Sequence, residues 1–152
     1  MKNIELFETL ETCKIHLKRA KYNHQKLQKI KIDQTLFVDE EKIMVVDAFM
    51  LRFIKLQDVM GYKLFKHLLN ALGDYKPDMS MIDILDKLEK LNLLSSSDEW
   101  MSYRKKRNEL THEYPNEEKN TLEGINLAIA QFSRIEAILL KIENYVQKHK
   151  LV

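Results

Sequence analysis

Apolar residues recur at steps of three or four near both ends of the chain, which is the spacing of one face of an α-helix. The most regular series runs from Leu122 to Val146 and predicts a long last helix that begins after an N-cap at Asn116. A second series predicts a first helix over about residues 3–30, with apolar positions at Ile4, Phe7, Leu10 and Leu17. Both helices are amphipathic, so each should bury one side against the rest of the protein.

The middle of the chain begins with a more uniformly apolar segment. Its apolar positions run from Ile43 to Leu72, between a good N-cap at Asp39 and a suitable helix stop at Gly73. Because this predicted helix is apolar on more than one face, it should lie at the centre of the fold.

Two shorter helices are predicted between the central and last helices. Ser80 with Asp83, and Ser96 with Glu99, have the spacing of capping boxes that open a helix. The first of these helices should end near Leu91. The second should end near His112, because Pro115 disfavours the helical conformation of the residue before it.

Five such segments predict an all-α fold, an antiparallel bundle of four to five helices, with residues 1–152 forming a single domain. The composition agrees with this prediction. Only three Gly and two Pro occur, while 45% of the residues are hydrophobic and 32% are charged. This is the profile of long helices with few turns.

Several classes of protein and site are disfavoured by the residues present. Cys13 has no cysteine partner for a disulfide or a zinc site, which favours a reducing compartment, and we expect the cytoplasm. Charges interrupt every apolar run near the N-terminus, so neither a secretory signal nor a membrane span is expected. No Gly-rich phosphate loop or His-Glu-x-x-His pair is present, and His16 and His24 are expected on the surface. We therefore predict no metal and no cofactor.

The formal net charge of +2 is small, but the cations are clustered. Residues 1–31 hold eight Lys and Arg against three Glu, and a second basic run is formed by Arg104, Lys105, Lys106 and Arg107. Each cluster fits either a polyanion or an ordinary solvated helix surface. The second leads directly into the segment with the most chemistry.

The segment from Arg107 to Tyr114 contains Arg107, Asn108, His112 and Tyr114. A guanidinium can hold two phosphate oxygens, and an imidazole can take or give a proton near neutral pH. Together they suit metal-free cleavage of RNA, in which the 2′-hydroxyl attacks the neighbouring phosphorus. Asn108 would hydrogen-bond phosphate or ribose, or hold the imidazole. Arg104, Lys105 and Lys106 would add contacts to phosphate.

Geometry sets a condition on this site. Arg107 and His112 are five residues apart, so in an ideal helix their side chains point about 140° away from each other. One regular helix cannot aim both at one atom. We therefore expect the helix to unwind before Pro115 and a second copy of the segment to face the first in a symmetric homodimer.

The spacing of Arg107, Asn108, His112 and Tyr114 resembles the R-x4-H-x-Y signature of the HEPN superfamily, specifically the HepT-like toxins that pair with minimal nucleotidyltransferases. The predicted helix order also resembles theirs. A second stretch, from Arg52 to Asp58 with Gly61 and residues 63–65, looks like the second helix of one HepT-like subgroup.

The resemblance implies a HEPN-like helical bundle and a metal-independent endoribonuclease toxin that acts on RNA as a homodimer. Arg107 and His112 would be catalytic, with support from Asn108. Tyr114 would be where a cognate nucleotidyltransferase antitoxin attaches AMP, which adds bulk and negative charge beside the catalytic residues. From its place after the helix end, the Tyr114 hydroxyl is also a candidate contact to substrate phosphate.

Two further interpretations remain open at this point. The chain resembles relatives that serve as non-catalytic substrate-binding or regulatory subunits of a nucleotidyltransferase, and it also fits a helical interaction module. Asp47, Arg52 and Asp58 are charges on a mostly apolar helix, where an unpaired charge is costly. Asp58 is a candidate to hold Arg107 or Arg104 in place; an internal ion pair or a dimer contact is the alternative.

Overall fold

The computed structural model describes residues 3–110 and 118–152, and the regular secondary structure of these two ranges is entirely helical. In chain order the elements are α1 (Ile4–Leu27), the 3-10 helix η1 (Gln34–Val38), α2 (Glu40–Val59), the π-helical turn η2 (Met60–Leu64), α3 (Phe65–Ala71), α4 (Met81–Lys90), α5 (Ser97–Leu110) and α6 (Glu118–Lys148). The predicted all-α helical bundle is confirmed.

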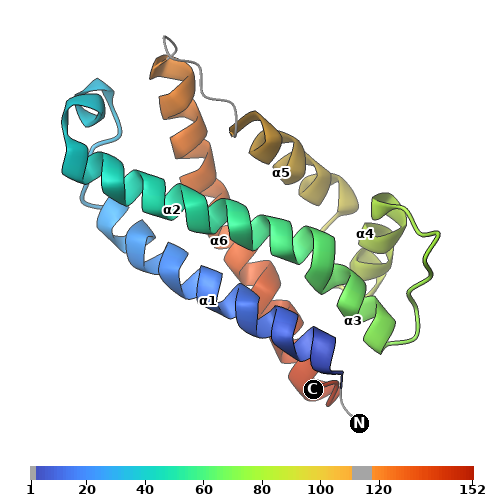
Figure 1. Cartoon of the computed structure of the whole chain (residues 1–152). Helices are drawn as coiled ribbons and strands as arrows, with labels where there is room; N and C mark the ends of the chain where they lie inside the picture. The colour runs from blue at the N-terminus through green and yellow to red at the C-terminus, as the bar shows by residue number, and fades with distance from the viewer. Residues whose placement is uncertain (1–2, 111–117) are drawn as a thin grey trace.

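The helices α2 and α3 join through η2 into one long rod at the centre of the bundle, as Figure 1 shows. Helix α1 runs alongside α2 in the opposite direction, and α6 crosses behind both. Helices α4 and α5 pack together on the remaining side. At the base of the bundle, the Asn3 backbone N–H and side-chain amide both donate to the Leu151 carbonyl, at 3.4 and 3.3 Å.

Most of the predicted helix ends are present. Asp39 caps α2 by accepting a hydrogen bond from the Lys42 backbone N–H at 3.2 Å, and Ser80 opens α4 with a complete capping box. Gly73 follows the end of α3 with φ of +76°, a conformation that costs glycine least. Ser96 Oγ accepts from the Glu99 backbone N–H at 3.0 Å at the start of α5. The predicted cap at Asn116 lies outside the described residues.

Three details of the helices differ from the sequence prediction. Helix α1 ends at Leu27 instead of near residue 30, and the short helix η1 was not predicted. On α1 the core face carries Leu6, Leu10 and Cys13, while Ile4 and Phe7 are about half exposed. The prediction of the buried face of α1 was therefore partly wrong at the first turn of the helix. Single apolar residues at a helix end are often exposed, so they do not indicate which side of the helix is covered.

The π turn η2 was also not predicted. It inserts an extra residue between α2 and α3, at the point where α5 packs on the rod. Gly61 lies in this turn against the Trp100 indole: a Cβ placed on Gly61 would lie 3.4 Å from the indole nitrogen. The close approach of α5 to the rod therefore depends on a small residue at this position.

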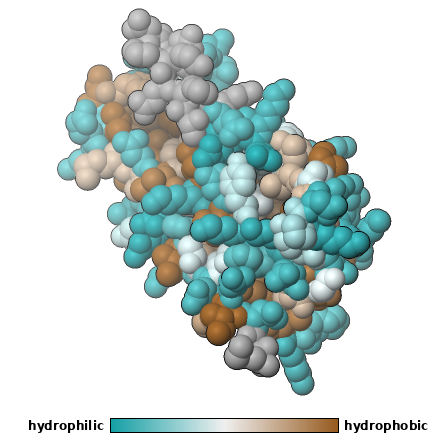
Figure 2. Space-filling view, turned by 45° about the vertical axis from the view of Figure 1, so that its right-hand side comes forward, coloured by the Kyte–Doolittle hydropathy of each residue, from teal (hydrophilic) through white to brown (hydrophobic). Residues whose placement is uncertain are grey.

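Aromatic and aliphatic side chains from every α-helix form one core. Its largest fully buried members are Trp100, Phe49, Phe53, Phe65 and Phe132. The series predicted for the last helix is confirmed, because Ile125, Phe132, Ile135, Leu139, Ile142 and Val146 are all buried. On the face drawn in Figure 2, hydrophobic side chains gather in separate patches within a mostly hydrophilic surface.

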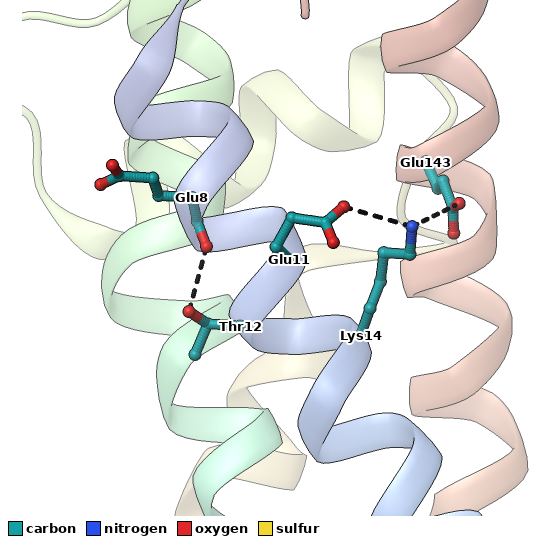
Figure 3. A network of polar contacts seen from close by, with 5 residues as sticks. All are labelled: Glu8, Glu11, Thr12, Lys14 and Glu143. Carbon is teal, nitrogen blue, oxygen red and sulfur yellow. Dashed lines mark hydrogen bonds and ion pairs between the residues drawn. The ribbon is translucent and has the colours of Figure 1, made fainter.

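Part of the N-terminal basic cluster is paired with carboxylates of the chain itself. Lys14 of α1 lies between Glu11 on its own helix and Glu143 of α6, at 3.3 and 3.5 Å, as Figure 3 shows. Seven residues further along α1, which is about two turns, Lys21 pairs with Glu136 of α6 at 3.1 Å. Ion pairs at this exposure contribute little to stability. They do show that these two cations face α6 rather than an external polyanion.

No helix within the described ranges is long and apolar enough to cross a membrane.

Candidate functional site

Helix α5 carries both its anchor to the core and the second basic cluster. Trp100 and Tyr103 are buried, and Arg107 follows Tyr103 by four residues, so it lies on the same inward side of the helix. Arg107 is accordingly about one fifth exposed, whereas Lys105 on the outer side of the helix is exposed. The core packing of α5 therefore places Arg107 beside the central rod.

Asp58 of α2 accepts a hydrogen bond from Arg107 Nη2 and forms an ion pair with it. The two side chains are 22% and 30% exposed, so the pair is partly removed from water and more strongly coupled than a surface pair. The contact that the sequence suggested between Asp58 and Arg107 is thus present. It fixes the guanidinium at the C-terminal part of α5.

A second contact holds the other end of the same guanidinium. Arg107 Nη1 donates to Asn108 Oδ1 at 3.2 Å, while Arg107 Nε is buried and has no hydrogen-bond partner. A guanidinium has five N–H donors in a fixed plane. Asp58 and Asn108 orient that plane, and they leave donors on the same side chain for an anion.

Arg104 makes a separate contact with the π turn. Its Nη2 donates to the Tyr62 hydroxyl at 3.1 Å, and its guanidinium carbon lies 5.0 Å from the centre of the Tyr62 ring. Tyr62 was not predicted from the sequence as part of this site. The available signal was its spacing: Asp58 and Tyr62 are four residues apart on one helix, and Arg104 and Arg107 are three apart on the other.

The remaining cations of the run are oriented toward solvent. Lys105 is exposed and Lys106 is half-buried, and neither forms an ion pair with any side chain that the structure describes, which are those of residues 3–108 and 118–152. Four cations thus lie within one helical turn, and among the described side chains only Arg107 has a carboxylate partner. This end of α5 is a positive surface that suits an anion.

His112 and Tyr114 lie outside the described residues. The structure therefore places Arg107, Asn108 and Asp58 together, with Arg104, Lys105 and Lys106 on the same turn. The predicted convergence of His112 on Arg107 stays a prediction.

The other histidines have local partners. His24 was expected on the surface but is half-buried, with its ring 4.8 Å from that of Phe132. His16 is also half-buried and contacts Arg52, and His67 Nδ1 lies 2.9 Å from Thr9 Oγ1. The surface expectation was wrong for both His16 and His24, because each faces a neighbouring helix of the bundle. Across the part of the chain that the structure describes, no three His, Cys, Asp or Glu residues are grouped as metal ligands.

A polar network attaches α5 to α6 in the turns of α5 that precede Arg107. Glu99 accepts hydrogen bonds from the Tyr103 hydroxyl and from Arg134 Nη1, the latter at 3.1 Å. The Tyr103 hydrogen bond is the main cause that holds the pKa of Glu99 below its ordinary value. Burial, followed by the contact with Glu99, raises the pKa of Tyr103 to about 12.

Because of this network, we expect the free energy of unfolding to decrease both at acidic and at strongly alkaline pH. The lowered pKa of Glu99 stabilises the fold above about pH 4.3, and this contribution is lost as the pH falls through the folded-state pKa. The raised pKa of Tyr103 stabilises the fold below about pH 10, and this contribution is lost as the pH rises toward 12. Thermal unfolding across pH should show a weaker acid dependence for Glu99→Gln and a weaker alkaline dependence for Tyr103→Phe. Unchanged profiles in both variants would contradict the role of the network.

Comparison of the chain with protein-family models, with curated proteins and with solved structures gives no match. Its chemistry is therefore inferred from its own residues.

Proposed function

We propose that this protein is a metal-independent endoribonuclease that cleaves RNA with Arg107 and His112 in the cleft of a homodimer. The observation that carries the proposal is the fixed guanidinium of Arg107. It is partly buried, oriented by Asp58 and Asn108, and located in a turn with three further cations. A preoriented cation in a partly dry site stabilises developing negative charge more than a mobile one in water.

The reaction follows from the chemistry of RNA. The ribose 2′-hydroxyl loses its proton to His112, its oxygen bonds to the adjacent phosphorus, and the bond from phosphorus to the 5′-oxygen breaks as that oxygen takes a proton from water. Charge on the phosphoryl oxygens increases as the new bond forms. Arg107 stabilises that charge through the N–H groups that Asp58 and Asn108 leave open.

Asp58 acts on the substrate through Arg107, so it is a positioning residue in this proposal. Its carboxylate lowers the net positive charge of the site, which weakens simple attraction for RNA. The same contact limits the rotation of the long Arg107 side chain, so less conformational entropy is lost when phosphate binds. Arg104, Lys105 and Lys106 then supply the attraction that holds the RNA backbone.

The proposal extends to a pair of proteins. A minimal nucleotidyltransferase would act as the antitoxin by attaching AMP to Tyr114, which follows His112 by two residues. The second candidate function is a non-catalytic subunit that binds substrate for such an enzyme. The ion pair between Asp58 and Arg107 is the observation that favours this alternative, because a cation already paired with a carboxylate can serve to link α2 and α5 without taking part in chemistry.

Metal-free cleavage is the direct test of the proposed reaction. The purified full-length chain is expected to cut single-stranded RNA in excess EDTA and to leave 2′,3′-cyclic phosphate and 5′-hydroxyl ends, because the 2′-oxygen is the nucleophile. Mass spectrometry of the products identifies both ends. DNA of the same sequence, which lacks the 2′-hydroxyl, is the matched control and should remain intact. Cleavage only after addition of magnesium would contradict the mechanism, and binding of RNA without cleavage would favour the non-catalytic subunit.

A further inference from the structure

A groove of about 600 Å³ lies between α1 and α2, lined by residues that the proposed cleavage site does not use. Four of its side chains are cationic: Lys18, Arg19 and Lys21 from α1, and Arg52 from α2. No acidic side chain lines it among the residues that the structure describes. The groove is therefore positive along both of its walls.

Most of this positive charge is not compensated locally. Lys21 has the ion pair with Glu136, but Lys18, Arg19 and Arg52 form none with any residue described by the structure. Arg52 Nη1 instead donates to His16 Nδ1 at 3.2 Å, and since a guanidinium only donates, the histidine nitrogen must accept. Burial, followed by the charges of Arg52, Lys55 and Arg19, lowers the pKa of His16. Several cations thus surround a neutral histidine. The positive charge of these cations favours an anionic partner in the groove.

The same groove also carries exposed apolar surface. Tyr22 of α1 and Leu51 of α2 line it and are 60% and 50% exposed. Ile15 and Met44 lie seven residues before Tyr22 and Leu51 and are also at least half exposed. A separation of seven residues places side chains on the same side of a helix. The two helices therefore present an apolar strip bordered by cations.

We propose that the α1–α2 groove is a docking site for an acidic amphipathic helix of a partner protein. Two neighbouring helices form a channel into which a third helix packs by side-chain interdigitation. Apolar residues of the incoming helix cover Tyr22 and Leu51. Its carboxylates pair with Lys18, Arg19 and Arg52.

Charge and apolar area together select this occupant over two others. A second copy of the chain docked groove to groove would bring like charges together, which costs free energy. An RNA strand would neutralise the cations and could stack a base on Tyr22, but it would leave Ile15, Met44 and Leu51 of the strip without apolar partners. An acidic amphipathic helix satisfies both features.

The test uses the full-length chain and synthetic peptides of about 16 residues, long enough to form a helix on binding. The acidic probe carries Leu at helical spacing with Glu on its flanks, and the matched control peptide has Lys in place of every Glu. Fluorescence anisotropy is expected to show binding of the acidic peptide, weakened by added salt, and at least about tenfold weaker binding of the basic peptide.

Variants of the chain locate the binding surface. The double variant Lys18→Glu with Arg19→Glu and the single variant Leu51→Gln should each weaken binding of the acidic peptide by about tenfold or more. The matched control, Lys87→Glu with Lys90→Glu, makes the same charge change on the exposed side of α4 and should leave the affinity within about twofold, since screened charges act only over a short range. Circular dichroism establishes that each variant keeps its helical fold.

Three outcomes would overturn the proposal. The first is equal affinity for the acidic and basic peptides, and the second is equal weakening by the groove and control variants. The third is displacement of the peptide by a single-stranded RNA of about 12 nucleotides that loses affinity in the same groove variants, which would make the groove a nucleic-acid surface. Because the assay measures peptide binding, it is independent of whether the chain cleaves RNA.

Discussion

Replacing Arg107 with alanine is expected to reduce RNA cleavage by about 10²- to 10³-fold or more, the usual effect of removing a preoriented donor to a transition-state oxyanion. Arg107→Lys should recover little activity, because an ammonium keeps the charge but lacks the planar fork that Asp58 and Asn108 orient. Initial rates on a fluorogenic RNA oligonucleotide measure both variants. Lys87→Ala removes a cation from α4 and serves as the matched control with wild-type activity.

The same substitution also tests whether the site is shared between subunits. Arg107→Ala and His112→Ala are each expected to be inactive alone. If one subunit supplies Arg107 and the other His112, an equal mixture that exchanges subunits should recover about a quarter of the wild-type activity, since half of the dimers then contain one intact site of two. Recovery would be absent for a site built within one subunit. Cleavage by Arg107→Ala at the wild-type rate would contradict the catalytic assignment altogether.

Replacing Trp100 with alanine is expected to lower the free energy of unfolding by about 3–5 kcal/mol, the typical cost of truncating a large buried aromatic residue. Its side chain is 1% exposed, its ring centre lies 4.7 Å from that of Phe65, and its indole covers Gly61. Urea denaturation followed by circular dichroism gives the change directly. In a domain of this size the thermal midpoint should fall by roughly 6–20 °C.

Trp100→Phe and Ile82→Ala separate packing from simple loss of apolar area. The first keeps an aromatic ring in the core and should cost less than the alanine variant. The second truncates a residue on α4 that is 47% exposed, so its effect should be small. A loss of stability from Trp100→Ala no larger than that from Ile82→Ala would mean that α5 is not anchored through this side chain.

Much of the fold could be predicted because its signals are local. Asp39, Ser80 and Ser96 accept hydrogen bonds from backbone N–H groups within a few residues, and Gly73 supplies one positive φ, so these helix ends can be recognised without knowing the neighbours. The buried face of α6 follows from one unbroken period.

Features that depend on neighbouring helices could not be predicted in the same way. The π turn at Met60–Leu64 accompanies the packing of Gly61 on Trp100, and the stacking of Arg104 on Tyr62 depends on which helix lies beside α5. Asp58 could be suggested as a partner of Arg107 only because a charge on an apolar helix requires compensation. The sequence did not distinguish Arg107 from Arg104 as that partner.

The π turn also bears on how the chain can change in length. Removing one residue from Met60–Leu64 would restore an ordinary α-helix and leave the faces of α2 and α3 nearly in register, because the turn already holds one residue more than an α-helical turn. Phe65, Leu68 and Leu69 would keep their places in the core, and Asp58 would keep its orientation on the other side of the cut. A single deletion within α2 would instead rotate everything after it by about 100° and turn those three side chains out of the core. Variation in length among related chains is therefore expected at this turn and in the loop after Gly73, and not within α2.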